Sequence, residues 1–383
     1  MAAFGTVFTP EMILSRFSND SWTEPQFVAT DSISLHPGAH VLHYSSTCFE
    51  GLKAFKHADG SVHIFRMDKN VARLAQSSAL LALPKFDPAM LSRMIVDMVG
   101  RYASEVPTPP GSMYIRPTHI GTEASIGKAA APSLESMLYV LLSPVGDYFA
   151  GGAKPLRLLL EDNARCAPHM GMVKSGGNYA SALQPIMKAR AAVQADQVLF
   201  CPNGDVQETG AANFLLIDGN EIITKALDAS FLHGITRDSI LTLARDRGMK
   251  VSERELTVDE LLERAAKPGA EAALSGTAAV LTPVGTLIHN GKEYQVGSGE
   301  AGSSTNALRM PMVGGSVYAM SKSALSGLTQ GLARELGPRG ITINNVQPGP
   351  VDTDMNPANS DFAESLIGLM AVGRYGHVEE IAS

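Results

Sequence analysis

The side chain best suited to covalent chemistry is Lys174, in the segment VKSGGNYASALQ (173–184), which carries almost no other charge. A lysine amine is nucleophilic only when neutral, and removal from water lowers its pKa because the charged form loses its hydration. Apolar residues precede this lysine, and glycines after it let backbone come close to a flat ligand. The pattern indicates a Schiff base with an aldehyde cofactor, and a surface lysine on a loop is the alternative.

Three further segments carry groups that suit the same kind of ligand. Glu208, among small residues in GDVQETGAANFLL, could pair with a protonated pyridine nitrogen, or it could be a turn or capping glutamate. In HGITRDSI a turn directly precedes a helix, so the N–H groups of Ile235 and Thr236 could face an anion or serve only as the helix start. SGTAAV adds small residues and the hydroxyl of Thr277, which suit a phosphate or a carboxylate.

The elements that must position these groups are of both kinds. Alternating and apolar runs predict a strand over 112–121 (SMYIRPTHIG) and a hairpin that turns around 57–60. An apolar stripe at helical spacing predicts a helix over 70–83 that stops before Pro84. Further helices are predicted over 236–248 and 257–266, between many short strands.

Composition limits the function classes. The 383 residues have a net charge of −7, with 31 basic and 38 acidic residues, so no basic patch indicates nucleic acid. The cysteines Cys48, Cys166 and Cys201 lack CxxC spacing, which argues against a zinc site and fits a reducing cytoplasm. No apolar stretch reaches about 18 residues, so no membrane span is expected, and no signal segment is recognised at the N-terminus.

Taken together, the segments resemble the branched-chain amino acid aminotransferases, which are fold-type IV pyridoxal-phosphate enzymes. The resemblance runs from about residue 5 to about residue 302 and includes, in family order, YSSTCFEGLKAFK, FRMDKNVARL, YIRPTHIG, VGDYF, VKSGGNYASAL, QETGAANF, HGITRDS and LSGTAAV. It implies an α+β protein with two α/β domains, the second barrel-like. The implied domains are a small substrate-pocket domain (1–145), a linker (146–152) and a large cofactor-binding domain (153–302).

The resemblance assigns the cofactor, pyridoxal 5'-phosphate, to specific residues. Lys174 would form the Schiff base and move the substrate's α-proton, while Tyr179 would bind the ring hydroxyl and Glu208 the ring nitrogen. Arg73 would grip the phosphate with a forked guanidinium, although a helix-surface arginine is the alternative from spacing alone. The implied cofactor-binding residues are Arg73, Lys174, Tyr179, Glu208, Ile235, Thr236 and Thr277.

The resemblance also implies the substrates. Leucine, isoleucine or valine would give its amine to the cofactor, and 2-oxoglutarate would take it to become glutamate, with ping-pong kinetics. Arg116 would accept the γ-carboxylate of glutamate, although each aromatic of the set could simply be packed in the core. The implied substrate-binding residues are Tyr44, Phe49, Tyr114, Arg116, Tyr148, Thr277 and Ala278. A homodimer is expected, and a D-amino acid aminotransferase matches the YIRP and FEGLKAFK segments less well.

The last 80 or so residues (303–383) differ in texture and resemble the second half of a short-chain dehydrogenase/reductase, a partial Rossmann-like α/β fragment. In that family a tyrosine and a lysine four residues apart, here Tyr318 and Lys322, donate and tune a proton, with Ser304 as the third member. The Gly-rich nucleotide-binding fingerprint is absent upstream, so we expect these residues to be vestigial. An NAD(P)-dependent reductase built on Tyr318 and Lys322, or a catalytically dead fusion, are the alternative functions.

Overall fold

The computed structural model describes residues 4–146, 154–278, 280–300 and 374. Contacts between Cα atoms separate the chain into two compact units, Met1–Thr305 and Asn306–Ser383, and every element below belongs to the first. The predicted site residues Tyr148, Ser304, Tyr318 and Lys322 lie outside the described residues. The domain boundaries expected near 145, 152 and 302 stay predictions.

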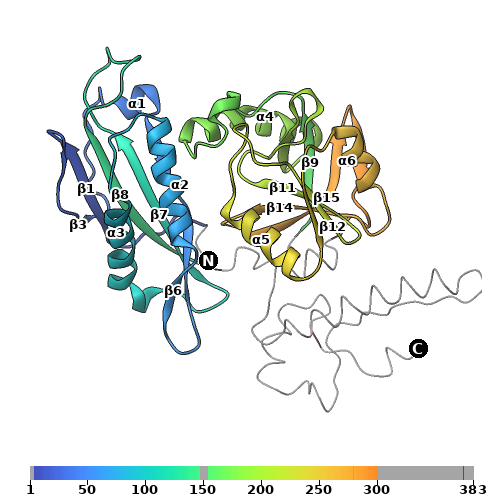
Figure 1. Ribbon diagram of the computed structural model, residues 1–383, viewed down its shortest axis with the longest axis horizontal. Coiled ribbons are helices and arrows are strands. Elements are labelled where there is room, and N and C mark those ends of the chain that lie inside the picture. The colour runs from blue at the N-terminus through green and yellow to red at the C-terminus, as the bar shows by residue number, and fades with distance from the viewer. Residues whose placement is uncertain (1–3, 147–153, 279, 301–373, 375–383) are drawn as a thin grey trace, which may run out of the picture. The chain divides into compact units, whose positions relative to one another are not determined.

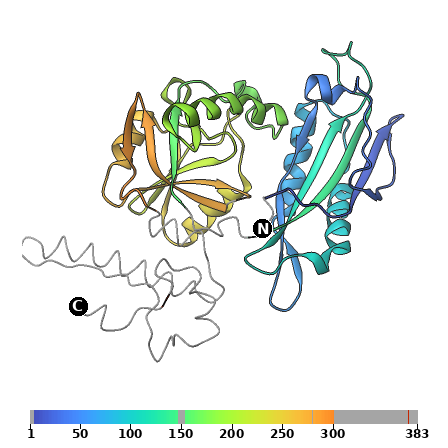
Figure 2. The ribbon, with the colours of Figure 1, turned by 180° about the vertical axis from the view of Figure 1, so that it is seen from behind.

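The first sheet has eight strands joined by antiparallel pairs in the order β2-β1-β8-β7-β5-β6, with β3 added to β1 and β4 to β7. Its strands are β1 (Glu11–Ser18), β2 (Ser21–Trp22), β3 (Gln26–Ala29), β4 (Thr47–Phe49), β5 (Leu52–Lys56), β6 (Val62–Ile64), β7 (Ser112–Gly121) and β8 (Ser136–Val145). The strand predicted over 112–121 is confirmed as β7, which runs beside β8 along its whole length (Figures 1 and 2). The predicted hairpin is also confirmed, since Gly60 N–H donates to the His57 carbonyl between β5 and β6.

Two amphipathic helices, α2 (Met67–Leu80) and α3 (Pro88–Arg101), pack on this sheet. Helix α2 begins and ends three residues earlier than the prediction of 70–83, because Ala82 takes a left-handed φ of 51° and turns the chain before Pro84. Full burial of an aliphatic side chain stabilises the fold by about 1.5–3 kcal/mol. The core beneath the two helices includes Leu52, Val71, Leu74, Leu91, Met94, Ile95, Met98, Met113, Ile115, Leu138, Val140 and Leu142. The short helices α1 (His40–Tyr44) and η1 (Ala103–Glu105) complete this part.

The second sheet has the strand order β10-β9-β15-β14-β11-β12-β13, with β16 on β15. Its strands are β9 (Leu156–Glu161), β10 (Gln197–Phe200), β11 (Asn213–Asp218), β12 (Glu221–Thr224), β13 (Lys250–Glu253), β14 (Glu271–Gly276), β15 (Val280–His289) and β16 (Lys292–Gln295). Two isolated bridges, Leu199 to Thr209 and Glu208 to Asn213, connect β10 to β11 through the segment between them. The strands from β10 to β11 therefore close into a ring, and the expected barrel-like second domain is confirmed.

Helices of the second sheet follow the predictions closely. Helix α5 (Ile235–Asp246) and helix α6 (Val258–Ala265) occupy the segments predicted as 236–248 and 257–266. Helix α6 turns Val258, Leu261 and Ala265 into the core, and Thr257 caps its start by accepting from Glu260 N–H. Helix α4 (Gly176–Val193) follows the lysine segment, and short turns η2 (Pro168–Met170) and η3 (Pro202–Gly204) precede and follow it.

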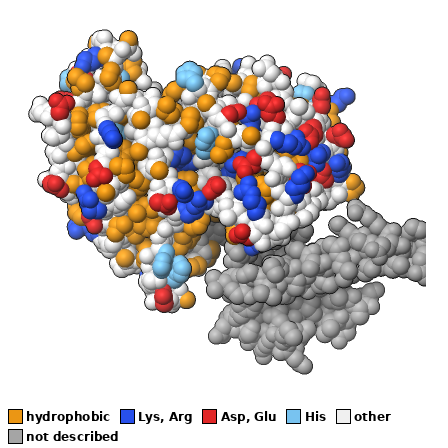
Figure 3. Space-filling view, viewed as in Figure 1, with side chains coloured by type: hydrophobic (Ala, Val, Ile, Leu, Met, Phe, Trp, Pro, Cys, Tyr) orange, Lys and Arg blue, Asp and Glu red, His pale blue; other side chains and the backbone are white. Residues whose placement is uncertain are grey.

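Basic and acidic side chains are interspersed on the surface near α5 and α6 (Figure 3). Ion pairs in this part include Arg245 with Glu253 and Arg254 with Glu260, both at 2.6 Å. Exposed pairs of this kind contribute about 0.2–1 kcal/mol each, so they do not decide the fold. Among the described residues, no helix combines the length and the hydropathy of a membrane span.

The start of α3 offers a test of the fold. Asp87 accepts a hydrogen bond from Ala89 N–H at 2.8 Å and precedes Pro88 at the first helical position. We expect Asp87→Ala to lower the free energy of unfolding by about 1 kcal/mol, because one helix amide then loses its acceptor. The measurement is urea denaturation followed by circular dichroism. Asp87→Ser keeps an acceptor and is the control; equal losses in both variants would contradict the capping role.

Candidate active site

The amine of Lys174 lies against a tyrosine hydroxyl. Lys174 belongs to the loop between η2 and α4, and its Nζ donates to Tyr179 Oη at 2.6 Å. The same Nζ is 5.1 Å from the ring centres of both Phe49 and Tyr179. Three of the predicted site residues are therefore brought together around one half-buried amine.

The peptide of this lysine is held by residues of the first sheet. Lys174 N–H donates to Ser77 Oγ at 3.2 Å, and Lys174 C=O accepts from Phe49 N–H at 3.0 Å. Ser77 belongs to α2 and Phe49 ends β4. The lysine loop therefore joins the two sheets at the point where the amine is presented.

Glu208 lies at the bridge that closes the second sheet, and its side chain is only 3% exposed. One carboxylate oxygen lies 2.6 Å from Arg165 Nη2 and also accepts from Leu232 N–H at 3.0 Å. The other oxygen is 3.4 Å from the amide nitrogen of Asn213. The alternative of a turn glutamate is too narrow a description, because this carboxylate is buried in an ion pair. Sequence reasoning missed Arg165, since its distance of nine residues from Lys174 carries no periodic signal.

The start of α5 is open to an anion. Gly234 precedes the helix and supplies no side-chain cap, so the first amides, including those of Ile235 and Thr236, have no partner within the helix. A Cβ added at Gly234 would lie 2.0 Å from Asn213 Oδ1, so no other residue fits there without displacement. Uncapped helix amides with a positive dipole end favour a phosphate.

Arg73 reaches the same place from α2. Its Nη1 donates to the carbonyl of His233, the residue before Gly234, at 2.7 Å. Its Nε and Nη2 donate to the two oxygens of Glu50 at 2.6 and 2.9 Å. A guanidinium has five N–H groups, so two remain after these three bonds. The side chain is 10% exposed, which excludes a helix-surface arginine.

Glu50 is a second residue that sequence reasoning missed. It is fully buried and also accepts from Asn70 Nδ2 at 2.8 Å and from Gly51 N–H at 3.2 Å. Burial alone would lower the pKa of Arg73, but the charge and hydrogen bonds of Glu50 raise it above its ordinary value. The guanidinium is thus permanently charged and oriented before any ligand arrives.

Arg116 and Tyr114 form a second polar group beside Phe49. The guanidinium carbon of Arg116 lies 4.5 Å from the ring centre of Phe49, and its Nη2 donates to Tyr114 Oη at 2.9 Å. The Nε of Arg116 is buried and has no partner among the described residues. Tyr114 can lie so close to the main chain because a Cβ at Gly51 would be 2.1 Å from its hydroxyl. An unpartnered guanidinium between aromatic rings is suited to a carboxylate.

The turn that carries Thr277 and Ala278 packs over Gly51. Thr277 Oγ1 donates to the Gly51 carbonyl at 3.0 Å, and Lys53 Nζ donates to the Ala278 carbonyl at 2.9 Å. These two predicted ligand residues therefore lie beside Tyr114 rather than apart from it. Their hydroxyl and carbonyl bonds are internal, so any contact with a ligand would use the N–H groups.

One predicted pocket residue lies elsewhere. Tyr44 ends α1, donates its hydroxyl to the carbonyl of Ile126 and packs its ring 4.8 Å from that of His40. The described contacts do not join it to Lys174. Family resemblance predicted its membership in the pocket, and that membership stays a prediction.

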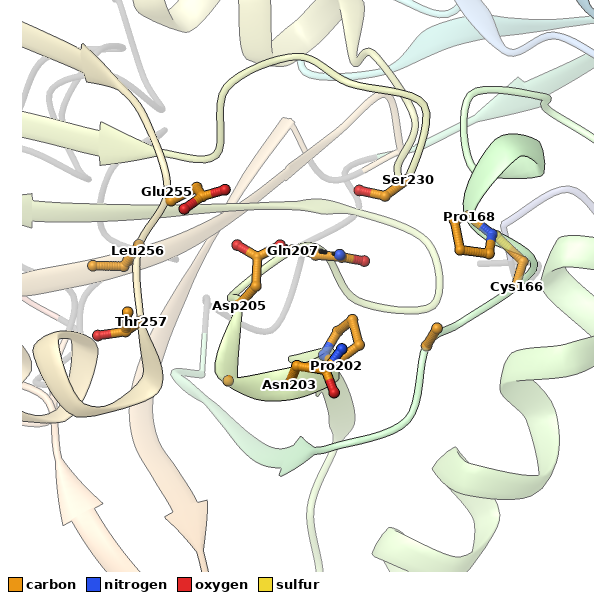
Figure 4. Close-up of a pocket in the computed structure, with 12 residues that line it drawn as sticks. Cys166, Pro168, Pro202, Asn203, Asp205, Gln207, Ser230, Glu255, Leu256 and Thr257 are labelled. Carbon is orange, nitrogen blue, oxygen red and sulfur yellow. Dashed lines mark hydrogen bonds between the residues drawn. The ribbon is translucent and has the colours of Figure 1, made fainter.

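A cavity of about 440 Å³ lies on the other side of the Glu208 segment (Figure 4). Asp205 and Gln207 line it and hydrogen-bond to each other at 3.1 Å, while Cys166 and Ser230 lie across from them. Successive side chains of extended backbone point to opposite sides, so Glu208 faces away from this cavity. It contains none of the predicted site residues.

The residues around Lys174 fit pyridoxal phosphate. The set supplies an amine beside a phenol, a buried carboxylate, and an uncapped helix start with an arginine next to it. These match an aldehyde, a ring nitrogen and a phosphate respectively.

Comparison with known proteins agrees with this assignment. The family model for amino-transferase class IV matches residues 47–287. A probable branched-chain-amino-acid aminotransferase of Streptomyces coelicolor is 39% identical over 80% of this chain and 86% of its own. A solved T.th. branched-chain amino acid aminotransferase with pyridoxamine 5'-phosphate has a TM-score of 0.64 and 29% identity, covering 78% of this chain and 91% of its own. Its complex with N-(5'-phosphopyridoxyl)-L-glutamate gives 0.63 and 28% over the same shares.

The C-terminal part matches a different family. The model for enoyl-(acyl carrier protein) reductase covers residues 270–383, which confirms the predicted resemblance to short-chain reductases and overlaps the first match at 270–287. The match begins upstream of the expected start near 303, within β14. Residues 5–302, with their site around Lys174, account for the length shared with the aminotransferases. The chain belongs to the class IV aminotransferase family, in the branched-chain-amino-acid group of its curated relatives.

Proposed function

We propose that this chain is a branched-chain-amino-acid transaminase, which transfers the amino group of leucine, isoleucine or valine to 2-oxoglutarate. The observation that carries the proposal is the contact of Lys174 Nζ with Tyr179 Oη at 2.6 Å beside Phe49. The names of its relatives support the same activity. Lys174 would hold pyridoxal 5'-phosphate covalently between the open start of α5 and Glu208.

The cofactor, when bound, supplies a protonated ring that draws electrons from the substrate's α-carbon. The buried carboxylate of Glu208 would stabilise the positive charge on the ring nitrogen, and Arg165 would fix its orientation. Arg73 and the first amides of α5, at Ile235 and Thr236, would bind the phosphate. These residues orient the ring without moving during the reaction.

Lys174 would also transfer protons. Once its amine is free, Nζ is a base that takes the proton from the substrate's α-carbon and returns it to the acceptor carbon. Tyr179 Oη, within hydrogen-bond distance, holds this amine in place. The Phe49 ring covers one side of the amine, which limits access of water.

Two kinds of substrate must enter the same pocket. Phe49 and Tyr114 provide aromatic surface for a branched aliphatic side chain. Arg116 Nε, which is buried and unpartnered among the described residues, would meet the γ-carboxylate of glutamate or 2-oxoglutarate. The α-carboxylate would take the N–H groups of Thr277 and Ala278. Ping-pong kinetics follow, since each substrate leaves before the next one binds.

We also propose a cytoplasmic homodimer in which a second copy completes the pocket, to which Tyr44 and Tyr148 would contribute. The C-terminal tail is proposed to be catalytically silent. Tyr318 and Lys322 stand without the Gly-rich nucleotide-binding segment that a reductase needs.

The first test is Lys174→Ala in the full-length chain. We expect the variant to show no covalently fixed cofactor after borohydride reduction and at least a roughly 10³-fold lower turnover of leucine with 2-oxoglutarate, because both the attachment point and the base are removed. Peptide mass spectrometry locates the attachment. The control is Lys188→Ala, at an exposed position on α4. Fixation of cofactor at another lysine of the wild-type chain would overturn the proposal, as would NADPH-dependent carbonyl reduction abolished by Tyr318→Phe.

The second test separates the two substrates. We expect Arg116→Met to lower kcat/KM for glutamate by roughly 10- to 100-fold, because a charged hydrogen-bond donor is worth about 1.5–3 kcal/mol. The value for leucine should fall less than about threefold, because its side chain needs no cation. Single-turnover half-reactions measure each substrate alone. Arg93→Met, on the exposed side of α3, is the control; equal losses for glutamate and leucine would contradict the assignment.

The third test concerns the charge of Glu208. Burial raises the pKa of this carboxyl to about 7 in the cofactor-free chain, although Arg165, the Leu232 N–H, Lys174 and Arg73 lower it. The folded pKa exceeds the unfolded value, so this group's contribution to the free energy of unfolding decreases as pH rises from about 4.5 to about 7. We expect the infrared band of a protonated carboxylic acid to disappear as pH passes through about 7.

Two variants make this titration specific. Glu208→Gln should lose the band, and Arg165→Met should move its midpoint to higher pH because a lowering charge is gone. Arg165→Lys, which keeps the charge, should lie between Arg165→Met and the wild type. A midpoint that stays unchanged in Arg165→Met would show that this ion pair does not govern the carboxyl.

A further inference from the structure

Lys174 is anchored through its own peptide rather than through regular secondary structure. It precedes α4, which begins at Gly176, and belongs to no strand. Its N–H donates to Ser77 Oγ at 3.2 Å and its C=O accepts from Phe49 N–H at 3.0 Å. These two bonds locate the lysine's Cα, and hence the base of the side chain that carries the amine.

Ser77 is placed to act as a rigid acceptor. It is fully buried, and its own carbonyl accepts from Leu81 N–H, so it is fixed in the last turns of α2. Arg73 lies one turn earlier on the same helix, and residues four apart share a face. The guanidinium proposed to bind the phosphate and the acceptor of the lysine's N–H are thus held at a constant spacing by one helix.

The residue beside Ser77 ties the two anchors of Lys174 together. Ser78 Oγ lies 3.3 Å from Cys48 Sγ, and Cys48 directly precedes Phe49. Ser78 Oγ also bonds to His119 Nδ1 at 2.9 Å, and His119 Nε2 bonds to Ser136 Oγ at 3.0 Å. Burial lowers the pKa of His119 to about 3, so the ring is neutral and adds no charge near the site.

The contacts therefore form a closed circuit from Lys174 through Ser77, Ser78, Cys48 and Phe49 back to Lys174. Cys48 also pairs with Ser175 in an isolated bridge, which fastens the residue after the lysine. Of these contacts, the hydroxyl of Ser77 is the only side-chain group that touches the lysine's peptide among the hydrogen bonds described here. Removing it would release the N–H side while the C=O side stays bound.

We propose that Ser77 is a positioning residue for the transamination, which holds the main chain of Lys174 so that Nζ reaches both the cofactor carbon and the substrate's α-proton. This rests on the proposed role of Lys174. Without the Ser77 hydroxyl the lysine loop has more freedom, and fewer of its conformations place the amine for proton transfer. Binding of the substrate, which depends on Arg116 and the aromatic rings, is not affected.

The experiment compares Ser77→Ala with the wild type in two ways. In the cofactor-free chain, hydrogen–deuterium exchange at the Lys174 amide, resolved by fragmenting its peptide, should accelerate roughly fivefold or more, because a hydrogen bond is lost. Amides in the middle of α2 should keep their rates. In the loaded enzyme, kcat for leucine should fall by roughly tenfold with KM changed less than about twofold, as expected when an interaction of the transition state is lost.

Two further variants complete the design. Ser92→Ala removes a helix serine hydroxyl of α3 that bonds only within its own helix, to the Pro88 carbonyl, and should leave both readouts unchanged. Ser77→Thr restores an acceptor and should recover the slower exchange and most of kcat. If Ser77→Ala fails to fold, Ser77→Cys, with a weaker acceptor of similar shape, takes its place with a smaller expected effect.

The outcomes separate this proposal from the assignment of Lys174. Wild-type exchange at the Lys174 amide in Ser77→Ala would overturn the anchoring, and a rise of KM with unchanged kcat would show a role in binding instead. Faster exchange with full activity would show that the anchor exists but does not position the amine. Failure of the wild-type chain to fix the cofactor at Lys174 would instead overturn the proposed function, while the exchange result would stand.

Discussion

The ion pair of Arg165 with Glu208 is the constraint around which the rest of the site is arranged. Two charges 2.6 Å apart are both almost completely removed from water, and such a pair is tolerated only when its geometry is fixed and its remaining groups are bonded. Glu208 meets that condition because it lies where the second sheet closes on itself and accepts from Leu232. The closure of the ring and the chemistry of the carboxylate thus depend on the same few residues.

The site is made from both sheets, and hydrogen bonds connect them. Arg73 bonds to the His233 carbonyl, and Thr277 bonds to the Gly51 carbonyl. Arg66, in a left-handed conformation just before α2, adds an ion pair with Asp238 at 2.6 Å. Most of these contacts end on main-chain carbonyls, so they depend on backbone placement more than on the identity of the partner side chain.

Much of this could be predicted from the sequence, and the reasons for the rest are physical. The strand over 112–121 and the helices α5 and α6 follow from local periodicity, which depends on near neighbours only. Lys174 and Tyr179 meet because they are five residues apart across the start of one helix. Arg165 and Glu50 could not be predicted, because their roles arise from partners more than twenty residues away. Family resemblance assigned the cofactor residues but gave no partner for the arginine that the phosphate would meet.

The helix boundaries show the same limit. The apolar stripe of α2 extends to Leu83, but the chain leaves the helix at Leu81 because Ala82 adopts a left-handed conformation. Hydrophobic pattern reports which side chains are buried and not which backbone conformation carries them. Leu83 is indeed buried, in the turn after the helix rather than within it.

The close approach of Tyr114 to Gly51 restricts which positions of the pocket can vary. Even one methyl group at position 51 would occupy the space of the phenol oxygen, which orients the guanidinium of Arg116. The surrounding main chain is already committed, since the Gly51 carbonyl accepts from Thr277. Adaptation to new side chains would therefore have to come from the aromatic walls, while the glycine floor stays invariant in any working descendant or engineered library.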